Sequence, residues 1–96
     1  MDAVVRTYSG KGAKELFDVL EKHKKDVETL MRSVTGFSDY SLIRTGEGGV
    51  SITVCRDKAG TAESVQKAKD WISKNAPSTG VGAPKVSEGS VILQLH

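Results

Sequence analysis

The spacing of apolar residues changes several times along the chain, and each change predicts a different element. Alternating residues from Ala3 to Tyr8 predict a first strand. From Leu16 to Val34 apolar residues recur at three- and four-residue steps, which is typical of one long helix with a buried stripe. Two further strands, Tyr40 to Ile43 and Val50 to Val54, flank the turn Gly46-Glu47-Gly48-Gly49, so this region reads as a hairpin.

The rest of the chain supplies one more helix and one more strand. Val65, Ala68 and Ile72 mark the buried side of a helix for which Thr61 is a plausible N-cap. The apolar run Val91 to Leu95 predicts the last strand. The order predicts one α+β domain over residues 1–96, a ferredoxin-like βαββαβ sandwich with a four-stranded antiparallel sheet and two helices on one face.

Alternation along the strands divides this sheet into two faces. Because the third strand has the most regular apolar alternation, we expect the helices to cover Val5, Val50, Ile52, Val54, Leu93 and Leu95. The opposite face would then carry Val4, Arg6, Tyr8, Ser51, Thr53, Cys55, Ile92 and Gln94. This second set is too apolar for a solvated face and too polar for a sealed core. We therefore predict that it forms the interface of a homodimer. A solvated sheet with scattered apolar residues is the alternative.

Composition narrows the class of protein. The 96 residues include 14 basic and 12 acidic ones, and the net charge of +2 predicts no nucleic-acid partner. The single cysteine, Cys55, cannot form an internal disulfide, and we expect it to be a small strand residue with no base beside it. The chain starts without a basic-apolar leader and has no apolar run of about 18 residues. We expect a cytoplasmic protein with no membrane partner.

Few residues suggest chemistry. His23 lies at the border of the first helical stripe, where it would act as an acid or base, or else be a half-buried boundary residue. Tyr40 and Trp71 are candidate walls of a ligand cavity between helices and sheet, and packing against the sheet is the alternative for Trp71. The two histidines and one cysteine have no metal-ligand spacing, so no metal and no cofactor are predicted.

Several motif-based functions fit the sequence poorly. The run Ser9 to Lys14 is rich in glycine and lysine but lacks the spacing of a phosphate-binding loop. The strand Val50 to Arg56 has no aromatic residue on which RNA bases would stack. Acylphosphatase-type chemistry would need an arginine and an asparagine together. Arg6 precedes the glycine turn, but Asn75 ends the second helix, so this remains a weak alternative.

One family resemblance follows from particular residues. The stretch Gly36 to Arg44, the glycine-rich turn, Ser51 to Asp57 and Gly60 to Ser64 resemble the dimeric α/β-barrel superfamily, within it the antibiotic-biosynthesis-monooxygenase-like small domains. The resemblance covers the whole chain in element order and about residues 36–72 in motif. It implies two sheets packed face to face, with helices outside.

The resemblance implies several different activities. Characterised members include cofactor-free oxygenases of polycyclic phenols, haem-degrading enzymes, isomerases and dehydratases. The oxygenases often carry a tryptophan where this chain has Cys55 and Arg56. Haem degraders combine an asparagine on an early strand with a histidine and a tryptophan. The first strand here has no asparagine, and Trp71 lies on the second helix without a histidine, so neither set of residues carries over.

Two functions of different classes remain. The first is a small-molecule enzyme, monooxygenase-like, with Trp71 and Tyr40 as cavity walls, His23 as acid or base, and the loop from Ala76 to Lys85 as a lid. The second is a non-catalytic homodimer that binds a small organic ligand or serves as a stress-related module. Since the sequence has no matched acid, base and nucleophile, we expect a homodimer with a small-molecule cavity and leave catalysis open.

Overall fold

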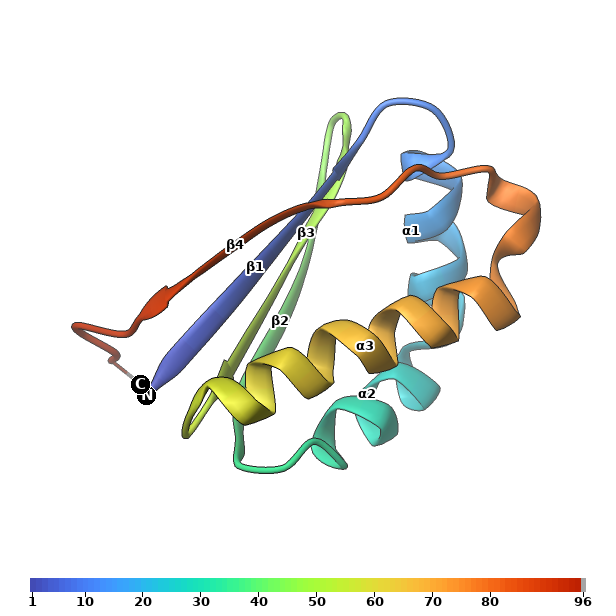
Figure 1. Cartoon of the computed structure of the whole chain (residues 1–96). Helices are drawn as coiled ribbons and strands as arrows, with labels where there is room; N and C mark the ends of the chain where they lie inside the picture. The colour runs from blue at the N-terminus through green and yellow to red at the C-terminus, as the bar shows by residue number, and fades with distance from the viewer. Residues whose placement is uncertain (96) are drawn as a thin grey trace.

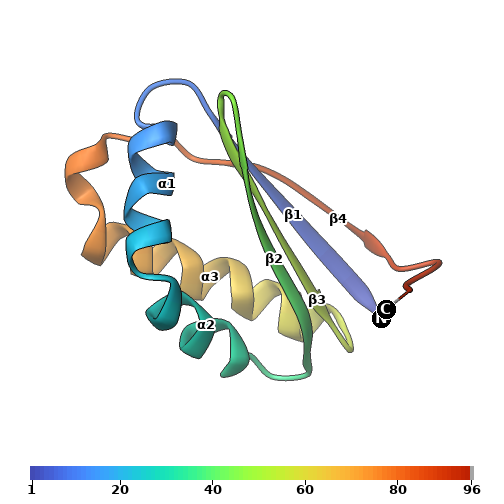
Figure 2. The same cartoon turned by 180° about the vertical axis from the view of Figure 1, so that it is seen from behind.

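The computed structural model describes residues 1–95. Its elements, in chain order, are β1 (Asp2–Ser9), α1 (Ala13–Lys22), α2 (Lys24–Arg32), β2 (Phe37–Thr45), β3 (Gly48–Cys55), α3 (Lys58–Asn75), the short 3-10 helix η1 (Pro77–Thr79) and β4 (Lys85–Ser90). The strands form one sheet in the order β2-β3-β1-β4, with every neighbouring pair antiparallel. The helices lie on one face of the sheet, as the opposite views of Figure 1 and Figure 2 show. The predicted ferredoxin-like sandwich is confirmed.

The first helical stretch is broken at His23, where one long helix was predicted. His23 has φ −110° and ψ 33°, outside the helical region, and its N–H bonds back to the carbonyls of Val19 and Leu20. Residues on both sides still face the sheet: Leu16, Phe17 and Leu20 in α1, and Val27 and Met31 in α2, are buried. The break redirects the helix without moving the apolar stripe away from the core.

α3 begins earlier than the sequence suggests. Asp57, not Thr61, is the N-cap, and its carboxylate accepts hydrogen bonds from the N–H groups of Ala59 and Gly60. Thr61 lies inside the helix and is buried. A Cβ on Gly60 would collide with the Thr35 carbonyl in the turn before β2 and with the Cys55 side chain at the end of β3. This early start brings the first turn of α3 onto the end of β3.

The two faces of the sheet are the reverse of the expected ones. The predicted dimer-face residues of β1 and β3 lie under the helices and are all at most 4% exposed: Val4, Arg6, Tyr8, Ser51, Thr53 and Cys55. Val5, Val50 and Ile52, expected in the core, lie on the face that no helix covers and are half-buried. The reason is the size of the side chains. α3 buries only small residues, namely Gly60, Thr61, Ser64 and Ala68, so it approaches closely over the small side chains of β3.

The last strand also lies elsewhere in the sequence. β4 pairs with β1 through the polar residues Lys85 to Ser90, whose partners run from Thr7 to Asp2. The apolar run predicted as this strand, Val91 to Leu95, follows it. Ile92, Leu93 and Leu95 are 97%, 75% and 82% exposed. Because an edge strand needs only backbone pairing on one side, polarity did not exclude Lys85 to Ser90 from the sheet.

The segment after β4 turns back across the open face of the sheet. Its first residue, Val91, donates its N–H to the Met1 carbonyl. Gln94 donates a 2.7 Å hydrogen bond to Asp39 Oδ2 on β2. Asp39 is the partner of Val54 in the pairing of β2 with β3. Val54 is 8% exposed although it lies on this face. One end of the open face is therefore partly covered by the chain itself, and the covering segment presents apolar side chains outward.

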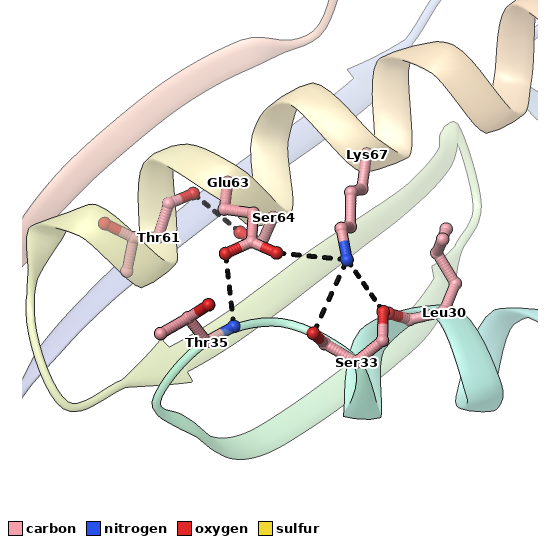
Figure 3. A network of polar contacts seen from close by, with 7 residues as sticks. All are labelled: Leu30, Ser33, Thr35, Thr61, Glu63, Ser64 and Lys67. Carbon is pink, nitrogen blue, oxygen red and sulfur yellow. Dashed lines mark hydrogen bonds and ion pairs between the residues drawn. The ribbon is translucent and has the colours of Figure 1, made fainter.

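A polar network ties α3 to the turn that follows α2 (Figure 3). Glu63 Oε1 accepts the N–H of Thr35, and Glu63 Oε2 pairs with Lys67 Nζ at 3.0 Å. Lys67 Nζ also donates to Ser33 Oγ at 2.8 Å. The hydrogen bond from Lys67, and then those from Thr35, lower the pKa of Glu63. The network fixes the helical layer over the sheet. Among residues 1–95, no helix combines the length and apolar character that crossing a bilayer requires.

Candidate ligand-binding site

Four polar side chains from three adjacent strands meet under the helices. Arg6 on β1 lies opposite Ser51 on β3, and its Nη2 donates a 2.6 Å hydrogen bond to Ser51 Oγ. Arg6 Nη1 donates to Tyr8 Oη at 2.7 Å. Ser51 Oγ donates to Tyr40 Oη on β2 at 3.0 Å. Residues two apart on a strand share a face, so β1 holds Arg6 and Tyr8 side by side. We call these four residues the arginine cluster.

Arg6 is a buried cation without a counter-ion. Arg6 is only 3% exposed, and no ion pair joins its side chain to a carboxylate within residues 1–95. Its Nε has no hydrogen-bond partner in that range either, and neither has the buried Oγ1 of Thr53. Buried charges in proteins are normally paired, because transferring an unpaired ion from water into the interior is costly. Arg6 departs from that rule.

The other members of the cluster do not neutralise Arg6. Burial raises the pKa of Tyr8 above its ordinary value of 10.0, although the neighbouring Arg6 guanidinium opposes this effect. Tyr8 is therefore a neutral phenol at physiological pH. Because its oxygen accepts the hydrogen bond from Arg6, its own proton is left to donate. The cluster thus combines a guanidinium and a phenol O–H, both donors suited to an anionic oxygen.

Two cavities meet at the arginine cluster. The inner cavity, about 20 Å³, lies between helices and sheet and has room for about one water molecule. The side pocket, about 410 Å³, lies between α3 and the segment that leads into β4. Arg6 and Tyr8 line both cavities. The other residues of the side pocket are Val65, Lys69, Ile72, Ser73, Val81, Gly82, Ala83, Pro84 and Val86. Its volume falls in the range of small-molecule sites.

The side pocket depends on how the loop after α3 is anchored. Gly12, at the start of α1, has φ 82°, and a Cβ on it would collide with the Thr79 carbonyl. Thr79 Oγ1 accepts the N–H of Val81 at 3.3 Å. Residues 79–81 thus pass close to the start of α1, and Val81 to Pro84 form one wall of the pocket. The loop expected to act as a lid, Ala76 to Lys85, therefore contains this wall.

A third hollow lies on the other side of the molecule. This groove, about 610 Å³, runs between α1, α2 and β2, and its rim carries Glu21, Lys24, Glu28, Arg32 and Arg44. Arg44 Nη2 pairs with Asp18 and Glu21, each at 3.1 Å. Since exposed charges of both signs surround it, the groove offers less desolvated binding surface than the side pocket.

The structure places the three predicted cavity residues close to one another. Tyr40 and Trp71 both line the inner cavity. His23 contacts the Trp71 ring edge to face, with 5.9 Å between ring centroids. Its Nδ1 lies 3.4 Å from Asp26 Oδ2, and its side chain is 40% exposed. His23 does not line either cavity at the arginine cluster.

The sequence alone did not single out Arg6 as a candidate site residue. Arg6 and Tyr8 were placed on one face correctly, but that face was assigned to a dimer partner. The sequence signal for this position was an arginine among the β-branched residues of the first strand, with a tyrosine two residues later. Cys55, by contrast, is a fully buried small residue, as expected, and burial followed by the charges of Asp57 and Glu63 raises the pKa of its thiol. Among residues 1–95, no group of three or more His, Cys, Asp or Glu side chains is arranged to hold a metal ion.

Comparison with known proteins identifies the fold. No protein-family model and no similar curated protein matches the sequence. Several solved structures superpose on nearly the whole chain, with TM-scores from 0.55 to 0.71. A monooxygenase from the gene ActVA-Orf6 of Streptomyces coelicolor, in complex with the ligand Nanaomycin D, has 17% identity and a TM-score of 0.64, covering 99% of this chain and 89% of its own.

Two further structures extend the comparison. A dimeric ferredoxin-like protein from an uncultured marine organism has 10% identity and a TM-score of 0.65, covering 99% of this chain and 95% of its own. The haem degrader MhuD from Mycobacterium tuberculosis, with two haems in its active site, has 17% identity and a TM-score of 0.55, covering 99% and 98%. The chain shares the ferredoxin-like fold of these structures. The resemblance noted in the sequence is thereby confirmed at the level of fold.

Proposed function

We propose that this protein is a homodimer that binds a small organic molecule in the side pocket, against Arg6 and Tyr8. The observation that carries the proposal is the unpaired guanidinium of Arg6 at the wall of a pocket of about 410 Å³. A cation in this place lowers stability unless something binds it. Natural pockets likewise combine mainly apolar walls with a few converging polar groups.

The homodimer part of the proposal rests on the open face of the sheet. Val5, Val50 and Ile52 are half-buried there without a covering helix, and Ile43 is 46% exposed beside them. The segment after β4 adds the outward-facing Ile92, Leu93 and Leu95. Contiguous apolar surface of this kind on a small domain favours self-association. A structural neighbour described as a dimeric ferredoxin-like protein supports the same assembly.

A pair of variants tests whether ligands use the side pocket. A library of small apolar acids, phenols and amides is screened for compounds that raise the melting temperature. A ligand at a hundred times its Kd stabilises the folded state by about 2.7 kcal/mol, which raises Tm by several degrees in a domain of this size. Ser73 lines the pocket, so Ser73→Phe should abolish the shift. Lys74→Phe, next to it and outside the pocket lining, should keep it. If no compound raises Tm, or both variants respond alike, the proposal fails.

A second candidate is cofactor-free oxygenation of a phenol. It is favoured by the neighbouring monooxygenase, which was solved with Nanaomycin D, and by the hydrogen-bonded chain Tyr8–Arg6–Ser51–Tyr40, which is suited to holding a phenolic oxygen. Oxygen consumption with polycyclic hydroquinones tests it. Oxygen uptake by the unmodified chain that is lost in Tyr40→Phe would support oxygenation at this site. Loss of the uptake in His23→Ala would support His23 as the acid or base, and full uptake would remove it from that role. Binding without uptake would favour the non-catalytic ligand-binding or stress-related module.

A further inference from the structure

The hydrogen bonds of Arg6 leave one edge of its guanidinium free. A guanidinium has five N–H donors in a planar fork. One donor of Nη1 goes to Tyr8 and one of Nη2 goes to Ser51, while the Nε–H has no acceptor. Both acceptors are hydroxyl oxygens without charge. Within the part of the chain that the structure describes, Arg6 therefore has neither a hydrogen-bond acceptor at Nε nor a negative partner.

Among residues 1–95, the covered side of the sheet supplies no such negative partner. Tyr8 remains a neutral phenol, as described above. The carboxylate that β4 places on this side, Glu88, accepts a 3.0 Å hydrogen bond from Thr61 on α3 instead. The inner cavity of about 20 Å³ has room for about one water, which would accept the Nε–H but bring no charge. Within residues 1–95 the Arg6 guanidinium therefore has no anionic partner.

The side pocket restricts what kind of molecule brings an anion to Arg6. Its walls are mainly apolar, with Val65 and Ile72 on α3 facing Val81, Pro84 and Val86. Lys69 adds a second positive charge among the lining residues. A carboxylate matches the planar fork of an arginine with two parallel N–H···O bonds, which a neutral amide cannot do as well.

We infer that the natural ligand of the side pocket is an apolar monocarboxylate whose carboxylate binds the guanidinium of Arg6. This inference rests on the proposed function and specifies its ligand class. Tyr8 donates its phenol proton to the same carboxylate, and the apolar body lies between α3 and the segment before β4. Arg6 is then paired in the complex as buried charges usually are.

Calorimetric titration with two matched probes, 2-naphthoate and 2-naphthamide, tests the inference. The two compounds share one ring system and differ only in the charged group. Naphthoate should bind at least about tenfold more tightly, because hydrogen bonds to a charged partner are the stronger ones. Arg6→Met should reduce naphthoate affinity by a similar factor and leave naphthamide unchanged. Lys69→Met, the matched control in the same pocket, should change naphthoate affinity much less.

The outcomes separate this inference from the proposed function. Equal affinity for naphthoate and naphthamide, or a loss confined to Lys69→Met, would overturn the carboxylate assignment while small-molecule binding still stood. Absence of binding by both probes while other compounds of the library raise Tm would also overturn it. If no compound of any class binds, the proposed function itself fails. Should Arg6→Met not fold, the two probes on the unmodified chain and on Lys69→Met still decide the question.

Discussion

Arg6 and Ser51 occupy paired positions on β1 and β3, and a 2.6 Å hydrogen bond from Nη2 to Oγ joins them beneath the helices. Through this bond Ser51 connects the β1 arginine to Tyr40 on β2. Three strands thus share one polar centre in the interior. Apolar residues of similar size would fill this part of the core without a buried charge.

The Ser51 hydroxyl should contribute measurably to stability. Ser51→Ala removes an acceptor of Arg6 and a donor to Tyr40 at a site only 1% exposed. We expect the free energy of unfolding to fall by about 1–3 kcal/mol, the usual consequence of leaving buried polar groups unpaired. Urea denaturation measures the change. Ser78→Ala, in the exposed 3-10 helix η1, should stay within about 0.5 kcal/mol of the unmodified chain. Equal effects of the two substitutions would contradict the role of the cluster.

A charge on the open face should separate the proposed homodimer. Ile52 lies in the middle of that face, opposite Val5 on β1 and Ser41 on β2. Light scattering should give twice the mass of one chain for the unmodified protein and the mass of one chain for Ile52→Lys, with circular dichroism unchanged. Ala62→Lys, on the exposed side of α3, is the control and should remain dimeric. A monomeric unmodified protein at high concentration would refute pairing through this face.

The element order could be predicted from the sequence, whereas the covered face could not. Periodicity separates Val50-Ile52-Val54 from Ser51-Thr53-Cys55, but it does not say which set the helices cover. That is decided by how closely α3 approaches, which depends on the small side chains of Gly60, Ser64 and Ala68. In this protein the most apolar set is not the core set, because the small and polar side chains of β3 face the helices instead.

Two other differences have equally local causes. No glycine or proline marks the break at His23, so a continuous apolar stripe could not reveal it. β4 joins the sheet through backbone pairing of Lys85 to Ser90, which hydrophobicity does not detect. Tyr40 and Trp71 line the inner cavity, and their part in ligand binding stays a prediction, whereas the surroundings of Arg6 are visible only in three dimensions.

Acidification should weaken the contact between α3 and the turn after α2. Because the pKa of Glu63 is lowered in the folded state, its carboxylate stabilises that state above the unfolded pKa of about 4.3, and the contribution is lost as the pH falls through the folded pKa. Urea unfolding between pH 3 and 7 should show a difference between the unmodified chain and Glu63→Gln that disappears at the acidic end. Glu47→Gln, in the exposed hairpin turn, is the control. A difference that is constant across this range would contradict the assignment.

The Cys55 thiol should be unreactive in the folded protein. Cys55 is fully buried, and burial together with the nearby acidic groups Asp57 and Glu63 raises the pKa of its thiol, so the reactive thiolate is scarce. Reaction with 5,5′-dithiobis(2-nitrobenzoic acid) near pH 8 should be slow in native buffer and fast in concentrated urea. A native rate equal to the unfolded rate would show that the end of β3 is open to solvent.

The measurement that tests the central claim most directly is the NMR signal of the Arg6 Nε–Hε group. Within residues 1–95 this group is a buried donor without an acceptor, and its signal is assigned by comparison with Arg6→Lys. On titration with 2-naphthoate we predict a downfield shift of this signal that saturates with the calorimetric binding curve, and no such shift with 2-naphthamide. Saturable binding of naphthoate that leaves the Arg6 signal in place would contradict the account.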